Sequence, residues 1–282
     1  MRISTTSIEG AQKTTKPAGD SVAGTGRLVI AIAIIMSISS FIFFYNSHLT
    51  LAYGDAASHL NIARRVVDNI SPGIAQLGGI WLPLPHILML PLIWIDPLWR
   101  SGIAGSLVSM ASYVVASWFI YSSVLNITGD RLGSFVGALA FIANPSMLYF
   151  QSTAMTEPLM IVTIVATLHF LILWAKSLEP KYLYAVGLSV FFATLSRYDG
   201  WFLVPTVLVC ILVIGILRRG SMFAEGSGLA FLSIAVYGAF LWMFYNWLIF
   251  NNPLNFAIGI GSGSWYAHQY ATSVEVSPKG NA

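Results

Sequence analysis

Long runs of apolar residues, separated by short polar or charged segments, dominate the pattern along this chain. A helix needs roughly 20 apolar residues to cross the hydrocarbon core of a bilayer. Runs of about that length predict an all-α integral membrane protein with about seven membrane-spanning helices. These helices are expected at residues 28–46, 102–125, 132–149, 157–175, 182–197, 201–217 and 228–250.

The connection between the first two runs, residues 47–101, is much longer than most of the others. Within it, Leu60, Ala63, Val67 and Ile70 recur at helical spacing, which predicts an amphipathic helix over residues 56–70 that lies on the membrane surface. A second apolar piece, residues 82–95, is too short to span and contains three prolines, so it predicts an interfacial or re-entrant segment. A loop of this length is more typical of function than of simple connection.

The two ends of the chain differ from its middle. Residues 1–26 are polar and rich in Ser, Thr and Gly, which predicts a disordered cytoplasmic tail. Residues 27–260 form the expected transmembrane module, and residues 261–282 form a tail on the outer side.

Composition supports the membrane assignment. Hydrophobic residues make up 56% of the chain and charged residues only 9%, so there is too little polar surface to cover a soluble globule. The net charge of +3 comes from scattered Lys and Arg without a basic run, which argues against a nucleic-acid partner. The single Cys210 lies in an apolar run and is interpreted as a small buried hydrophobe.

The distribution of Lys and Arg predicts the orientation of the spans. With the N-terminus in the cytoplasm, that side collects nine of the fourteen basic residues. The positive-inside rule therefore favours N-in and C-out. The long first loop, and the ionisable residues near the ends of later spans, then fall on the outer side of the membrane.

The first candidate site residues are Asp55 and His59, at the start of the predicted surface helix. Their spacing of four residues places a carboxylate and an imidazole on one helix face, which suits a base with a neighbour or two metal ligands. A simpler interpretation is that Asp55 only caps the helix. The neighbouring Arg64 and Arg65 are interpreted as contacts to lipid headgroups.

The stretch GGIWLPLPH, residues 78–86, adds Trp81 and His86. Either it is merely a stiff loop, or it forms a platform for a sugar or acceptor, because Trp offers a flat apolar face and His a hydrogen-bonding tip.

Two further candidates lie at the outer ends of later spans. Thr156 and Glu157 open the fourth span with good helix-start chemistry, although a carboxylate at the rim of the bilayer also needs water or a partner. Arg197, Tyr198 and Asp199 form the turn after the fifth span. Arg197 and Asp199 could simply neutralise each other, but the planar guanidinium there is well placed to bind the phosphate of a lipid.

This order of motifs resembles the GT-C superfamily of polytopic glycosyltransferases, especially the branch of protein O-mannosyltransferases and aminoarabinose transferases. The resemblance extends over roughly residues 27–260 and is carried by an acidic residue soon after the first span, then WLPLPH, TAMTEPL and SRYDGWF. Relatives continue with further spans, so we expect this chain to be a truncated or a minimal form.

The resemblance implies transfer of a sugar from a polyprenyl-phosphate donor to a protein, lipid or glycan acceptor at the outer face of the cell membrane. It implies catalytic roles for Asp55 and Glu157 and donor-phosphate binding by Arg197. We expect His59, Trp81, His86, Tyr198 and Asp199 to contact substrate, although the resemblance assigns no role to either histidine. A divalent metal ion held by Asp55, His59 and Glu157 is a further hypothesis.

Two other functions compete with this one. A multi-pass transporter or flippase for a lipid or small molecule is the alternative, but transporters usually place ionisable groups near mid-membrane and often have repeated halves. Here the predicted spans are nearly free of charge, and the first loop has no later counterpart. A noncatalytic scaffold subunit is the third interpretation, and it requires that Asp55 and Glu157 lie far apart.

Overall fold

The computed structural model of the chain describes residues 19–260, 262, 264 and 265. Most of the predicted N-terminal tail and most of residues 261–282 lie outside this range. All regular secondary structure among the described residues is helical, which confirms the all-α prediction. The first helix begins at Gly19, so residues 19–26, predicted as part of the disordered tail, are helical.

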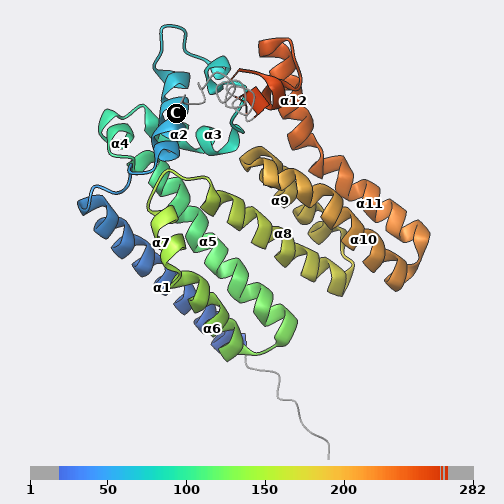
Figure 1. The fold of residues 1–282 in the computed structure, drawn as a ribbon. Coiled ribbons are helices and arrows are strands. Elements are labelled where there is room, and N and C mark those ends of the chain that lie inside the picture. The colour runs from blue at the N-terminus through green and yellow to red at the C-terminus, as the bar shows by residue number, and fades with distance from the viewer. Residues whose placement is uncertain (1–18, 261, 263, 266–282) are drawn as a thin grey trace, which may run out of the picture.

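Long helices pack side by side into one bundle, and a group of short helices sits at one end of it (Figure 1). We call this end the loop end. The bundle helices are α1 (Gly19–Asn46), α5 (Ile103–Thr128), α6 (Arg131–Ile142), α7 (Pro145–Gln151), α8 (Glu157–Ser177), α9 (Pro180–Ser196), α10 (Leu203–Arg219), α11 (Ser221–Ala235) and α12 (Tyr237–Phe250). The elements grouped at the loop end are α2 (Gly54–Val67), η1 (Ile74–Leu77), α3 (Leu84–Ile93), α4 (Asp96–Arg100), η2 (Tyr198–Phe202) and α13 (Asn255–Ile258).

Length and hydropathy make this a multi-pass membrane protein. Among the described residues, five helices are long and apolar enough to cross a membrane, or six if α6 and α7 together form one span. The predicted fifth span corresponds to α9, whose 17 residues are at the lower limit of usual span lengths. The count of seven therefore stays a prediction.

The predicted span 132–149 is not one straight helix. It is divided into α6 and α7, which are bent by 61° at the break. The cause is local, because Asn144 precedes Pro145, and proline disfavours a helical conformation in the residue before it. Asn144 instead caps α7, where its side-chain oxygen accepts a hydrogen bond from the backbone N–H of Met147 at 3.1 Å.

The predicted surface helix exists as α2, but its apolar side packs against protein. Leu60 and Ala63 are buried with residues of α3 and α5 in one cluster, whereas Val67 and Ile70 are exposed. Arg64 holds α2 in place, because its guanidinium donates hydrogen bonds to the Ile93 carbonyl and the Asp96 carboxylate. The interpretation of Arg64 as a lipid-headgroup contact is therefore wrong.

The segment between α7 and α8 is fixed tightly against α5, which positions the start of α8. Ser106 and Ser109 of α5 donate hydrogen bonds to the backbone carbonyls of Ser152 and Met155, at 3.0 and 2.9 Å. Directly before Ser106, Gly105 lies so close to Ala154 that a Cβ added at position 105 would be 2.9 Å from the Cα of Ala154. The absence of a side chain at Gly105 allows this approach.

Substituting Gly105 by Ala should therefore destabilise the protein. The added methyl group has to push two backbones apart, and overpacking of this kind typically costs about 1–3 kcal/mol. Thermal unfolding in detergent measures the effect. Gly226→Ala in α11 is the matched control, because a Cβ there meets nothing within 4 Å; equal melting temperatures for the two variants would contradict the close contact.

Candidate active site

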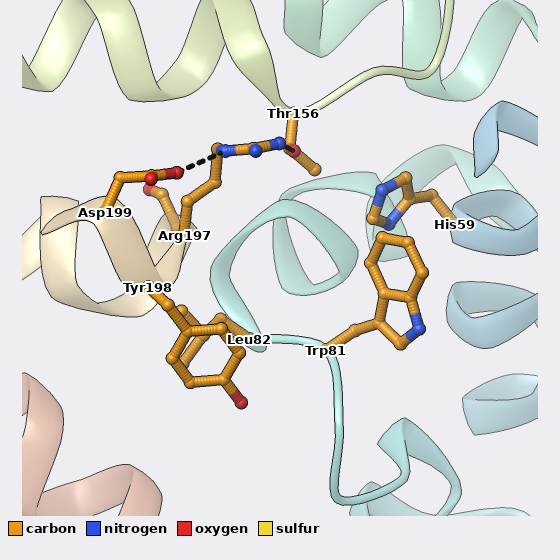
Figure 2. Close-up of a pocket in the computed structure, with 8 residues that line it drawn as sticks. His59, Trp81, Leu82, Thr156, Arg197, Tyr198 and Asp199 are labelled. Carbon is orange, nitrogen blue, oxygen red and sulfur yellow. Dashed lines mark hydrogen bonds and ion pairs between the residues drawn. The ribbon is translucent and has the colours of Figure 1, made fainter. Parts of the chain in front are cut away.

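A cavity of about 240 Å³ lies at the loop end, where three distant parts of the chain meet (Figure 2). Its walls come from the first loop, through α2 and the stretch before α3, from the start of α8 and from the junction of α9 with η2. The lining residues are His59, Trp81, Leu82, Thr156, Ser196, Arg197, Tyr198 and Asp199. Five of the side chains predicted to form the site, His59, Trp81, Arg197, Tyr198 and Asp199, thus line one cavity.

Arg197 makes the principal charged contacts of this cavity. Its Nη1 donates hydrogen bonds to Oε1 of Glu157 at 2.9 Å and to Oγ1 of Thr156 at 3.1 Å, and its Nε donates to Oδ2 of Asp199 at 3.0 Å. Nη2 has no hydrogen bond within the described residues. The side chain is 36% exposed, so the guanidinium can be reached from the cavity. Arg197 pairs with Asp199, as one interpretation of the sequence expects. It also lines a cavity, as the interpretation as a phosphate-binding residue requires.

Thr156 and Glu157 occupy the helix-start positions that the sequence predicted, but their side chains accept hydrogen bonds from Arg197. Thr156 is the N-cap residue of α8, yet its hydroxyl makes no capping hydrogen bond and accepts from Arg197 instead. Glu157 lies in the first turn, where a negative charge suits the helix dipole. Its second oxygen, Oε2, is buried and has no hydrogen-bond partner in the described part of the chain. The carboxylate itself does not line the cavity.

Packing around Gly200 and Tyr198 fixes the direction of Arg197. A Cβ at Gly200 would lie 2.2 Å from the Ala193 carbonyl oxygen, so η2 folds directly against the end of α9. The Tyr198 hydroxyl donates to the Ile80 carbonyl at 2.6 Å and accepts from Nε1 of Trp242 at 3.0 Å. This tyrosine therefore joins the first loop to α12. The role of Trp242 was not predicted, because a tryptophan within an apolar span resembles ordinary packing.

His59 and His86 form a buried pair beside the cavity. Nδ1 of His59 lies 2.9 Å from Nε2 of His86, at hydrogen-bond distance, and the two side chains are only 2% and 0% exposed. Trp81 packs edge-on against the His59 ring, with 4.4 Å between ring centroids. Figure 2 shows this indole and imidazole on the side of the cavity opposite Arg197.

Burial keeps both imidazoles neutral near physiological pH. It lowers the pKa of His59 from 6.5 to about 4, and the positive charge of Arg197 acts in the same direction. Burial and the neighbouring His59 lower the pKa of His86 to about 3, against a smaller opposing effect from the Leu82 backbone. Both groups therefore bind fewer protons in the folded state than in the unfolded state.

Asp55 lies in the first turn of α2, one helical turn before His59, but not at the predicted position. Tyr53 is the N-cap residue of α2, so the interpretation of Asp55 as a helix cap is wrong. Asp55 is half-buried, and its side chain makes no hydrogen bond or ion pair within the described residues. It does not line the 240 Å³ cavity.

The structure does not bring the hypothetical metal ligands together. Among the described residues, no three His, Cys, Asp or Glu side chains form a group that could hold a metal ion. Nδ1 of His59 is instead hydrogen-bonded to His86, and Oε1 of Glu157 accepts a hydrogen bond from Arg197. The residues Asp55, His59 and Glu157 thus do not fit a three-ligand site.

A second cavity, of about 510 Å³, lies between the end of α1 with the segment after it and the end of α4. Arg100 provides its cation, and Tyr45 and His48 are among its other lining residues. It contains none of the predicted site residues.

The lowered histidine pKa values predict acid sensitivity. The unfolded chain takes up protons near pH 6.5 and the folded chain only near pH 4, so the free energy of unfolding should be constant above about pH 6.5 and fall as the pH decreases toward 4. Thermal unfolding between pH 8 and pH 4 measures this loss.

The double variant His59→Asn/His86→Asn should lose less stability than the wild type over the same pH interval. His48→Asn is the matched control, because His48 is exposed and has a positive φ that Asn tolerates. If the double variant keeps the full acid sensitivity of the wild type, the pair is not its cause.

Comparison with known families adds an independent finding. Residues 99–252, just over half of the chain, match the family model described as dolichyl-phosphate-mannose-protein mannosyltransferase. The matched region includes Glu157 and Arg197 but not the residues of α2 and α3. A search of curated proteins finds no match to this chain.

Proposed function

Because the chain belongs to the dolichyl-phosphate-mannose-protein mannosyltransferase family and is a GT-C glycosyltransferase, we propose that it uses a polyprenyl-phosphate-linked sugar as donor. It transfers the sugar to a hydroxyl group of a protein, lipid or glycan acceptor. The reaction takes place at the extracytoplasmic face of the cell membrane, toward which the positive-inside rule directs the loop end. The observation that carries this proposal is the position of Arg197 beside the 240 Å³ cavity.

Arg197 suits the phosphate of the donor. Its guanidinium is planar and permanently charged, and the free Nη2 has two N–H bonds to offer. Its pair with Asp199 is weak, since the Asp199 side chain is 68% exposed and exposed ion pairs contribute little. A phosphate can therefore replace Asp199 at Nε, while the less exposed Glu157 keeps the guanidinium in place.

The donor's isoprenoid tail needs an apolar surface next to the phosphate site. Helix α12 is joined to the cavity wall by the hydrogen bond from its Trp242 to Tyr198 of η2. It exposes several large apolar side chains, among them Phe240, Phe244 and Leu248. A tail that follows this surface would remain in the hydrocarbon phase while its phosphate lies at Arg197.

Asp55 acts as the general base in this proposal. The acceptor oxygen attacks the anomeric carbon and loses its proton to the carboxylate of Asp55, while the bond from that carbon to the phosphate oxygen breaks. The bonding electron pair leaves with the polyprenyl phosphate, and Arg197 stabilises the added negative charge. Asp55 is suited to this step because its side chain has no partner among the described residues and lies one helical turn before His59, which lines the cavity.

Transfer from synthetic polyprenyl-phosphate sugars by the purified protein tests the role of Asp55. Asp55→Asn should reduce the rate by at least about 100-fold, because the amide cannot accept the proton. Asp130→Asn is the control, since Asp130 caps α6 and Asn caps helices equally well. Full activity of Asp55→Asn would exclude Asp55 as the base.

The same assay tests Arg197. Arg197→Ala should reduce kcat by about 100- to 1,000-fold, as loss of a donor to developing negative charge does. Arg197→Lys should be intermediate, because Lys keeps the charge but not the planar fork. Arg100→Ala is the control in the second cavity.

A double variant separates phosphate binding from structural damage. Arg197→Ala leaves Glu157 as a partly buried charge without a partner, which by itself lowers stability. Arg197→Ala/Glu157→Gln removes that charge and should regain thermal stability without regaining transfer. Recovery of transfer in the double variant would show that Arg197 has only a structural role.

A further inference from the structure

The buried imidazole rings of His59 and His86 are hydrogen-bonded to each other, and only one of them reaches the cavity. A buried polar side chain needs at least one hydrogen bond, and each ring obtains one from the other. Only His59 also lines the cavity, where it faces the side occupied by Arg197 (Figure 2). His86 stands behind it, with no exposure.

The protons of this pair are assigned from the surroundings of His86. Nδ1 of His86 is buried and makes no hydrogen bond of normal geometry in the described residues. The Leu82 backbone nevertheless favours a proton on the ring, and the only acceptor that a backbone offers is its carbonyl oxygen. With the proton of His86 assigned to Nδ1, Nε2 of His86 is the acceptor in this hydrogen bond and Nδ1 of His59 is the donor.

This tautomer determines what His59 presents to a ligand. With its proton on Nδ1, His59 has a bare lone pair on Nε2, which has no hydrogen bond within the part of the chain that the structure describes. The ring cannot turn freely, because His86 holds one edge and Trp81 packs against it at 4.4 Å and 88°. His59 is thus a fixed, neutral hydrogen-bond acceptor beside the cavity.

We propose that Nε2 of His59 accepts a hydrogen bond from a hydroxyl group of the donor's sugar ring, with Trp81 as an apolar surface beside that ring. This inference rests on the proposed function and specifies how the same site recognises its sugar. Two observations favour a neutral hydroxyl over other donors: the cation Arg197 on the other side disfavours a positively charged group, and the lone pair requires an O–H or N–H.

The size of the cavity agrees with a single sugar ring. Pockets that enclose drug-sized ligands usually measure about 300–1,000 Å³. At 240 Å³, this one is smaller and suits one ring between the phosphate at Arg197 and the imidazole at His59.

His86 is a positioning residue in this arrangement. It does not reach the cavity, but it fixes the tautomer of His59 by accepting the Nδ1 proton. Replacing it should release the His59 ring and weaken discrimination between hydroxylated and deoxygenated sugars.

A panel of donor analogues tests the proposal. The probes are mannosyl-phosphoryl-polyprenol and its 2-, 3-, 4- and 6-deoxy derivatives, and kcat/KM is measured for wild type, His59→Gln and His59→Phe. One deoxy derivative should be about tenfold poorer than the parent for the wild type, which is the usual effect of one neutral hydrogen bond. For His59→Phe the parent should be poorer by a similar factor, and that same derivative should suffer no further loss.

The His59→Gln variant distinguishes loss of the hydrogen-bond acceptor from a change in packing. Its side-chain oxygen can still accept a hydrogen bond, so His59→Gln should keep part of the discrimination that His59→Phe loses. His86→Leu should behave like His59→Phe in discrimination, while its melting temperature reports any loss of folding.

The possible failures are distinguishable. No transfer of mannose by the wild type would overturn this inference together with its mannosyl donor, and no transfer from any polyprenyl-phosphate sugar would overturn the proposed function. Transfer by the wild type, with every deoxy derivative losing the same factor in wild type and His59→Phe, would overturn the role of His59 alone.

Discussion

The contact of Arg197 with Glu157, Thr156 and Asp199 holds together the end of the bundle on which the site depends. Charged groups near a bilayer are costly unless they are paired or hydrated. Here one guanidinium satisfies oxygens from the start of α8 and from the junction of α9 and η2. The same geometry leaves Nη2 of this partly exposed side chain without a partner in the described part of the chain, so a structural ion pair and a phosphate site can share one side chain.

The rest of the loop end supports this contact from behind. Ser106, Ser109 and Gly105 of α5 fix the backbone before α8, and Gly200 allows η2 to fold against α9. Tyr198 then connects this region to the first loop and to α12. The site is therefore built by backbone carbonyls, small residues and one tyrosine, none of which carries charge into the bundle.

The cavity offers complementary chemistry on its two sides. Arg197 provides a cation, whereas His59 and Trp81 provide a neutral acceptor and an aromatic surface. A sugar phosphate presents the matching pair of features, an anion joined to a ring with hydroxyl groups. A histidine with an ordinary pKa would become cationic in mild acid, but burial holds the pKa of His59 near 4 and keeps the two sides distinct.

Sequence patterns predicted the membrane class, the helical fold and the helix-start position of Thr156 and Glu157, because apolar run length and capping chemistry are local properties. They failed where a side chain serves a distant partner: Thr156 bonds Arg197, Arg64 bonds Asp96, and His59 pairs with His86 from another helix. The N-cap of α2 was predicted at Asp55, two residues after its observed position at Tyr53, which is a usual error at a helix end. The break at Asn144 could have been found, since Asn-Pro is a turn signal.

The most direct test of the account is an experimental structure of the protein with a non-transferable polyprenyl phosphonate sugar bound. The account predicts the phosphonate within hydrogen-bond distance of Arg197 and the sugar ring between His59 and Trp81. A head group found instead in the 510 Å³ cavity beside Arg100 would contradict it.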